Sequence, residues 1–145
     1  MKVLFIEDYA LAAALVRDSL QRKAPDIELE IVSSIESALQ RLGMPVQKDS
    51  HSRRGTSAPM NFDAVLTDLN LPDGSGLEIL QRLRVQGASL PVIILTGSVS
   101  DAIVKEALDA GASAVFDKQS NYLRLLPEAL ANAVLTASRN ATFLN

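Results

Sequence analysis

The chain has 145 residues, which suits one domain and excludes two large ones. Its 14 Lys and Arg residues against 17 Asp and Glu residues give a formal charge of −3, which argues against the basic surface that direct nucleic-acid binding needs. Cysteine is absent, which excludes disulfides, thiolate metal sites and a cysteine nucleophile and suits a reducing compartment.

The first half of the chain predicts two strands, two helices and a long loop. Residues 3–6 are continuously apolar, as in a strand buried on both faces. This run is too short for a signal peptide or a membrane span, so we expect a cytoplasmic protein without membrane association. Residues 27–31 alternate between apolar and acidic side chains, which predicts an edge strand. Helices are expected at 9–23 and at 34–42, the second opened by a capping box of Ser33 and Glu36, followed by an irregular loop at about 43–61.

The second half repeats the alternation of apolar runs and amphipathic stretches. Residues 64–66 and 92–95 predict two more interior strands, and residues 114–116 predict a fifth strand. Helices are expected from Ser75 and Glu78 to residue 85, from Ser98 and Asp101 to Gly111, and over 122–138. The whole pattern is typical of the α/β class, with a parallel sheet between two layers of helices.

The last predicted helix has an unusually broad apolar stripe. The stripe is wider than one sheet face requires, which leaves two interpretations. The pattern favours a broad core face rich in alanine, and the alternative is a contact surface for a partner, including a second copy of the chain. The residues of the stripe are Leu123, Leu126, Leu130 and Val134, with Leu125, Ala129 and Ala133 beside them.

Polar residues that carry chemistry follow directly after the apolar runs. In an open parallel sheet, binding sites form beyond the carboxyl ends of the strands, so these side chains are expected to converge. Crowded carboxylates repel one another and are neutralised by protons or by a cation, and Mg²⁺ suits oxygen ligands of this kind. The residues in question are Glu7 and Asp8, Asp68, Thr96, and Asp117 with Lys118.

This donor set also suits phosphoryl transfer. Lys118 offers a positive charge and Thr96 a hydroxyl donor for phosphoryl oxygens, because such transfer depends mainly on positioning and charge neutralisation. One of the carboxylates can then act as the nucleophile and form an acyl phosphate.

The residues that carry this chemistry resemble the receiver domains of two-component response regulators, the CheY-like family. The resemblance rests on Thr67-Asp68-Leu69-Asn70-Leu71-Pro72 followed by Gly76, and covers the chain from about residue 2 to residue 138. It is supported, in the order found in the family, by Glu7-Asp8, Thr96-Gly97, and Gly111-Ala112 followed by Lys118.

The resemblance implies a flavodoxin-like three-layer sandwich, with a five-stranded parallel sheet in the order 2-1-3-4-5 and five helices, in a single receiver domain over 1–145. It implies that Asp68 accepts a phosphoryl group from a sensor histidine kinase or a histidine phosphotransfer protein. It further implies a Mg²⁺ site held by Asp8, Asp68 and the backbone carbonyl of Asn70, with Glu7 commonly acting through a metal-bound water.

The resemblance also assigns roles to Thr96, as the switch hydroxyl, and to Lys118, as the lysine that pairs with the phosphate. Several features depart from the family pattern, among them Gln119, which follows the lysine where many members have proline, and the long loop at 43–61. Glu7 stands where the family often has aspartate. Its extra methylene changes how far the carboxylate reaches but not its charge. Val115 stands where the family usually has tyrosine or phenylalanine, and Phe116 beside it points to the opposite face of a strand.

The leading interpretation is therefore a signalling receiver, not an enzyme, whose own catalysis is limited to self-phosphorylation and slow self-dephosphorylation. Its partner is a downstream protein or an output domain outside this chain. The alternative is a receiver-like interaction module that works without phosphorylation, which the valine at 115 makes plausible. A phosphatase of the aspartate-nucleophile type would need an acid at position 70, where Asn70 stands, and His51 is interpreted as a loop residue.

Overall fold

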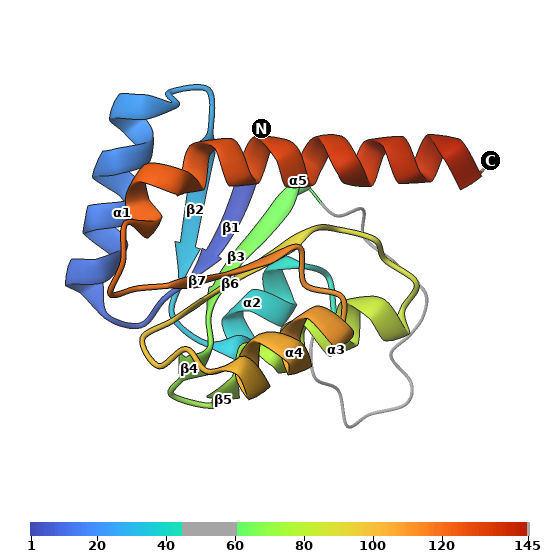
Figure 1. The fold of residues 1–145 in the computed structure, drawn as a ribbon, viewed down its shortest axis with the longest axis horizontal. Coiled ribbons are helices and arrows are strands. Elements are labelled where there is room, and N and C mark those ends of the chain that lie inside the picture. The colour runs from blue at the N-terminus through green and yellow to red at the C-terminus, as the bar shows by residue number, and fades with distance from the viewer. Residues whose placement is uncertain (45–60, 145) are drawn as a thin grey trace.

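The computed structural model describes residues 1–44 and 61–144, with side chains to residue 138. Five parallel strands form the main sheet in the order β2-β1-β3-β6-β7, which confirms the expected order 2-1-3-4-5 (Figure 1). The strands are β1 (Lys2–Ile6), β2 (Glu28–Val32), β3 (Ala64–Asp68), β6 (Val92–Thr96) and β7 (Ala114–Asp117).

Five helices cover the two faces of the sheet, so the three-layer flavodoxin-like fold is confirmed (Figure 1). On one face, α1 (Ala10–Lys23) and α5 (Tyr122–Leu144) cover a core that contains Phe5 and Leu66. On the other face, α2 (Ile35–Arg41), α3 (Leu77–Val85) and α4 (Asp101–Asp109) cover a core that contains Leu4 and Ile94. Two separate apolar cores thus hold the sheet between its helices.

The burial of the strands follows their hydrophobic patterns. Every residue of β3 and β6 is buried, whereas β2, at the edge of the sheet, is half-buried or exposed throughout, as its alternating sequence predicts. Three strands extend past their apolar runs to end on polar residues, namely Asp68, Thr96 and Asp117, because the backbone pairing continues one or two residues further. These polar residues therefore lie at one edge of a rigid sheet.

A second, two-stranded sheet was not predicted from the sequence. It pairs β4 (Asn70–Leu71) with β5 (Gly74–Ser75) in antiparallel fashion, directly after Asp68. Strands of two residues are too short to show any hydrophobic alternation, so the pattern could not reveal them. The hairpin fixes the course of the chain immediately after β3.

The predicted capping residues were wrong by one or two positions. The N-cap of α2 is Ser34, not Ser33, and its hydroxyl accepts from the amide of Ser37. The N-cap of α3 is Gly76, not Ser75, although the hydroxyl of Ser75 accepts from the amide of Leu77, the first residue of the helix, at 3.1 Å. The N-cap of α4 is Ser100, not Ser98, so this helix starts later than expected. Serines one or two positions apart before α2 and α4 offer more than one register, and only the backbone angles decide which serine is the cap.

Asp73, in the β4–β5 turn, is a second cap for α2 that the sequence did not suggest. Its carboxylate accepts from the amides of Ile35 at 2.9 Å and Glu36 at 3.1 Å, 38 and 37 residues away. Burial alone would raise the pKa of Asp73, but these backbone hydrogen bonds outweigh it and lower the pKa below its ordinary value. The carboxylate thus ties the hairpin to the start of α2.

We expect Asp73→Ala to lower the free energy of unfolding at pH 7 by about 1 kcal/mol, the usual loss when a helix cap is removed. Because the pKa is lowered in the folded state, this stabilisation is present above the ordinary value of 3.8 and is lost as the pH falls through the folded value. Urea denaturation at pH 7 and at pH 3 measures both effects. Asp26→Ala is the control, and an Asp73 variant as stable as that control at pH 7 would contradict the capping role.

The last helix is mainly a core helix in its described part. Leu126 and Leu130 are fully buried, Ala129 and Val134 are half-buried, and Leu125 is exposed, so the broad stripe serves largely as a core face. The helix ends at Leu144, later than the expected residue 138, although its side chains are described only to 138.

Among the described residues, no helix combines the length and hydrophobicity needed to cross a bilayer. Most of the predicted 43–61 loop, with His51, lies outside the described residues.

Candidate functional site

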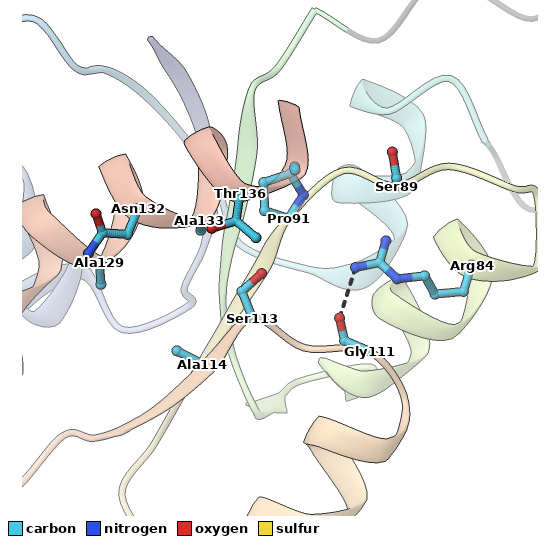
Figure 2. Close-up of a pocket in the computed structure, with 11 residues that line it drawn as sticks. Arg84, Ser89, Pro91, Gly111, Ser113, Ala114, Ala129, Asn132, Ala133 and Thr136 are labelled. Atoms are coloured by element: carbon cyan, nitrogen blue, oxygen red, sulfur yellow. Dashed lines mark hydrogen bonds between the residues drawn. The ribbon is translucent and has the colours of Figure 1, made fainter. Parts of the chain in front are cut away.

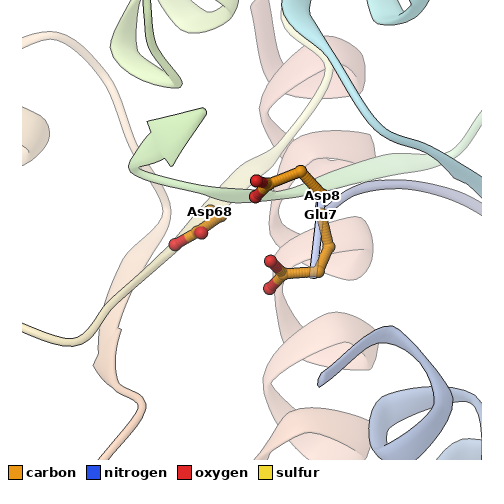
Figure 3. Close-up of side chains that lie close together, drawn as sticks. All are labelled: Glu7, Asp8 and Asp68. Atoms are coloured by element: carbon orange, nitrogen blue, oxygen red, sulfur yellow. The ribbon is translucent and has the colours of Figure 1, made fainter. Parts of the chain in front are cut away.

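Three carboxylates meet at the carboxyl end of the sheet, as the sequence predicts (Figure 3). Glu7 and Asp8 follow β1, and Asp68 is the last residue of the neighbouring strand β3. One carboxylate oxygen from each residue lies within 4.8 Å of the other two. Glu7 is only 3% exposed and Asp68 8% exposed, whereas Asp8 is exposed. The cluster therefore has a buried floor and one side open to solvent.

Lys118 neutralises part of this negative charge. Its Nζ donates to Glu7 Oε1 at 2.6 Å and lies 3.4 Å from Asp68 Oδ2. The lysine follows β7, and its backbone amide donates to the carbonyl of Thr96 at the end of β6, which fixes where its side chain starts. A single ammonium thus faces two nearly buried carboxylates and leaves an excess of negative charge.

The electrostatics of the site follow from this crowding. Burial raises the pKa of Asp68, and the nearby charge of Glu7 raises it further, against the opposing effect of Lys118. Burial alone would lower the pKa of Lys118, but its hydrogen bond to Glu7 and the charges of both carboxylates outweigh burial and raise it. The ionised form of Asp68 is therefore short of positive partners, while the ammonium form of Lys118 is stabilised.

The remaining predicted site residues lie around the same edge of the sheet. Thr96 is fully buried at the end of β6, next to β3, and its Oγ1 accepts from the amide of Ser98 at 3.1 Å. Asn70 is exposed in β4, two residues after Asp68, and pairs with Ser75. Asp117, at the end of β7, is outside the carboxylate cluster, and its Oδ1 accepts from the amide of Gln119 at 2.8 Å. That carboxylate supports a local turn.

The backbone around Asp68 is held by contacts that sequence reasoning missed. Thr67 donates its hydroxyl to the carbonyl of Asp68 at 2.9 Å, and the amide of Gly76 donates to the carbonyl of Leu69 at 2.7 Å. A Cβ at Gly76 would lie 2.3 Å from the carbonyl oxygen of Asp68, so any side chain there would force the backbone to shift. Gly76 belongs to the motif that follows Asp68, but no sequence signal indicates how close the two backbones come.

Val115 and Phe116 lie on opposite faces of β7. Val115 packs against the core under α2, α3 and α4, whereas Phe116 packs against the core under α1 and α5. The ring of Phe116 therefore does not stand in for an aromatic side chain at position 115, as strand alternation predicts.

The carboxylate cluster fits a small divalent cation. Its donors are hard oxygens, they lie close enough to share one ion, and their charge exceeds that of the ammonium beside them. Within the described part of the chain, this is the one group of three or more carboxylate or histidine side chains close enough to hold a metal together.

Comparisons with known proteins agree with this arrangement. The family model of the response regulator receiver domain matches residues 3–130. The two-component response regulator PhoP of Pseudomonas aeruginosa is 32% identical over 140 residues, which cover 95% of this chain and 53% of that protein. The methanogenesis regulatory protein FilR1 of Methanothrix harundinacea is 29% identical over 134 residues, which cover 92% of this chain and 27% of that protein.

The fold has close counterparts among solved structures. A CheY-like response regulator receiver domain protein from Methanospirillum hungatei superposes with a TM-score of 0.72 at 21% identity, over 96% of this chain and 97% of that one. The chain spans about a quarter to a half of the length of the first curated relatives that it matches. With the match over residues 3–130, the chain belongs to the response regulator receiver domain family.

Proposed function

We propose that this receiver is an Mg²⁺-dependent phosphoacceptor and that Asp68 is the residue phosphorylated. The observation that carries the proposal is the position of the Asp68 carboxylate, which lies 3.4 Å from Lys118 Nζ and in one cluster with the carboxylates of Glu7 and Asp8. Burial and the nearby charge of Glu7 raise the pKa of Asp68 and so disfavour its ionised form, and a bound cation would relieve this.

The metal is proposed to be held by Asp8, Asp68 and the backbone carbonyl of Asn70, with Glu7 in support. When bound, Mg²⁺ supplies charge neutralisation for phosphoryl oxygens. Glu7 is already engaged, because one of its oxygens accepts from Lys118 and the other accepts from the amide of Tyr9 at 3.2 Å. We therefore assign to Glu7 the additional task of positioning Lys118.

The chemical step belongs to Asp68. An oxygen of its carboxylate attacks the phosphorus of a phosphohistidine, and the phosphorus–nitrogen bond breaks with its electron pair left on the imidazole. The product is an acyl phosphate on Asp68. Lys118 balances the charge of the transferred phosphoryl oxygens, and the Thr96 hydroxyl donates to one of them. The phosphoryl donor is proposed to be a histidine kinase or a histidine phosphotransfer protein.

The rest of the signalling role is also a proposal. Residues 1–145 form one receiver domain, active in the cytoplasm, whose only catalysis is self-phosphorylation and slow hydrolysis of its acyl phosphate. The new charge on Asp68 biases the surface formed by α4, β7 and α5 towards a downstream protein or an output domain. A homodimer through this receiver is one form that the output can take.

The direct test is incubation with acetyl phosphate, with and without Mg²⁺, followed by intact-mass spectrometry and peptide mapping. We expect one hydroxylamine-labile phosphoryl group, formed only with Mg²⁺ and located on the peptide that contains Asp68. Metal binding with no phosphoryl group under these conditions would favour the interaction module instead. Hydrolysis of an added phosphomonoester would point to a phosphatase.

Lys118→Ala is expected to slow phosphorylation by acetyl phosphate about 100-fold, because removal of one charge-stabilising donor typically costs that much. Intact-mass spectrometry over time measures the rate, and circular dichroism checks that the fold is retained. Lys23→Ala, at the far end of α1, is the matched control. A rate within twofold of that control would remove Lys118 from the phosphoryl site.

A further inference from the structure

A cleft lies at the end of the sheet opposite to Asp68. It is lined by Pro91, just before β6, by Ser113, just before β7, by Arg84 of α3 and by the alanine-rich face of α5 (Figure 2). Its volume is about 440 Å³, within the range of roughly 300–1,000 Å³ typical of small-molecule sites. The proposed phosphoacceptor site uses none of these residues.

The cleft contains one formal charge among its lining residues, the half-buried guanidinium of Arg84. Arg84 Nη1 donates to the carbonyls of Ala88 at 3.0 Å and Leu90 at 2.9 Å, and Nη2 donates to the carbonyl of Gly111 at 2.9 Å (Figure 2). These are neutral acceptors, and no carboxylate in the described part of the chain pairs with Arg84. Burial lowers the pKa of Arg84, but an arginine stays charged at neutral pH.

The guanidinium of Arg84 is held in place, but not all of its N–H groups donate to the described part of the chain. Three of its five N–H groups donate to backbone carbonyls from two different loops, which fix its plane. A Cβ at Gly111 would lie only 2.9 Å from Nε, so a side chain at this position would crowd the guanidinium. A guanidinium fixed in this way loses little conformational entropy when it binds an anion.

The other lining residues fit the same kind of ligand. Ser89, Ser113 and Asn132 offer neutral hydrogen-bond donors, and no acidic residue is among the lining residues described. Ala129 and Ala133 form an apolar wall on α5, facing Arg84 across the cleft (Figure 2). The site therefore combines a single unopposed positive charge with a small apolar surface.

We propose that this cleft binds a small organic anion, with its carboxylate or phosphate group paired to Arg84 and its apolar part against Ala129 and Ala133. A carboxylate and a phosphate share the planar pair of oxygens that an arginine fork recognises. The proposal is independent of phosphorylation at Asp68.

The test is a titration of the metal-free ¹⁵N-labelled chain followed by amide chemical shifts. The probes are benzoate, its neutral isostere benzamide, and inorganic phosphate. We expect saturable shifts at Ser89, Gly111, Ser113 and Asn132 with benzoate, and binding of benzamide at least about tenfold weaker. Stronger saturation by phosphate than by benzoate at these amides supports a phosphate head group, and the reverse supports a carboxylate.

Two variants test the geometry. Arg84→Gln is expected to weaken benzoate binding at least about tenfold, whereas Arg82→Gln, on the same helix but outside the cleft, leaves it unchanged. Since Arg84 also ties two loops together, Ala133→Leu provides a second test that leaves the guanidinium in place and fills the cleft from α5. Equal binding of benzamide, shifts confined to the Asp68 end of the sheet, or unchanged affinity in Ala133→Leu would each overturn the proposal.

Discussion

Asp68→Asn is expected to abolish incorporation of phosphate from acetyl phosphate, because the amide offers no nucleophilic oxygen of comparable charge. The same change is expected to stabilise the metal-free fold at pH 7. Burial and the charge of Glu7 raise the pKa of Asp68 in the folded state, so its ionised form disfavours folding. Intact-mass spectrometry measures the first effect, and urea denaturation measures the second.

The sign of the pH dependence is fixed by the direction of that shift. With the folded pKa above the ordinary value of 3.8, the wild-type chain loses stability as the pH rises from that value through the folded pKa. The free energies of unfolding of the wild type and of Asp68→Asn, plotted against pH, should therefore be equal at low pH and differ at neutral pH. Mg²⁺ is expected to stabilise the wild-type chain more than the variant, because one proposed ligand is missing in the variant.

Asp117→Asn is the matched control, since Asp117 also ends a strand at this edge of the sheet but lies outside the carboxylate cluster. It is expected to be phosphorylated like the wild-type chain. A phosphorylated Asp68→Asn variant would mean that another side chain is the acceptor. A variant less stable than the wild type at pH 7 without Mg²⁺ would mean that Lys118 more than compensates the charge of Asp68.

The fold could be predicted because its strands differ so clearly in hydrophobic pattern. The uninterrupted apolar runs of β1, β3 and β6 belong to strands covered on both faces, and the alternation of β2 marks an edge. The convergence of Glu7, Asp8 and Asp68 could be predicted for a related reason. Parallel strands end at the same edge of a sheet, so the residues that follow them meet whatever their separation along the chain.

The contacts that set the electrostatics could not be predicted in the same way. Lys118 and Glu7 are 111 residues apart, and whether the lysine bonds Glu7 or Asp68 more closely depends on side-chain rotamers. The capping of α2 by Asp73 depends on a hairpin too short to leave a pattern. In the sequence, Arg84 likewise looks like an ordinary residue on a helix surface. Its hydrogen bond to the carbonyl of Gly111, 27 residues away, depends on the fold. Local periodicity contains no information on such long-range contacts.

Gly76→Ala is expected to lower the free energy of unfolding by about 2 kcal/mol or more and to slow phosphorylation of Asp68. The backbone of Gly76 has ordinary helical angles, so alanine is not excluded by conformation. The added Cβ would instead lie 2.3 Å from the carbonyl oxygen of Asp68 and 2.9 Å from Thr67 Oγ1. A backbone carbonyl cannot rotate aside as a flexible side chain can, and overpacking of this kind typically costs about 1–3 kcal/mol.

Gly97→Ala provides the matched control, because Gly97 also lies beside the site, directly after Thr96, but a Cβ there meets nothing within 4 Å. Its stability is expected to stay within about 0.5 kcal/mol of the wild type. Urea denaturation of the two variants compares their stabilities, and the acetyl phosphate assay compares their rates. If Gly76→Ala matched Gly97→Ala in both, the close approach of β3 and α3 would not be what positions the phosphoacceptor. A loss of rate greater than the loss of stability explains would instead locate the damage at the backbone of Asp68, beside which Gly76 lies.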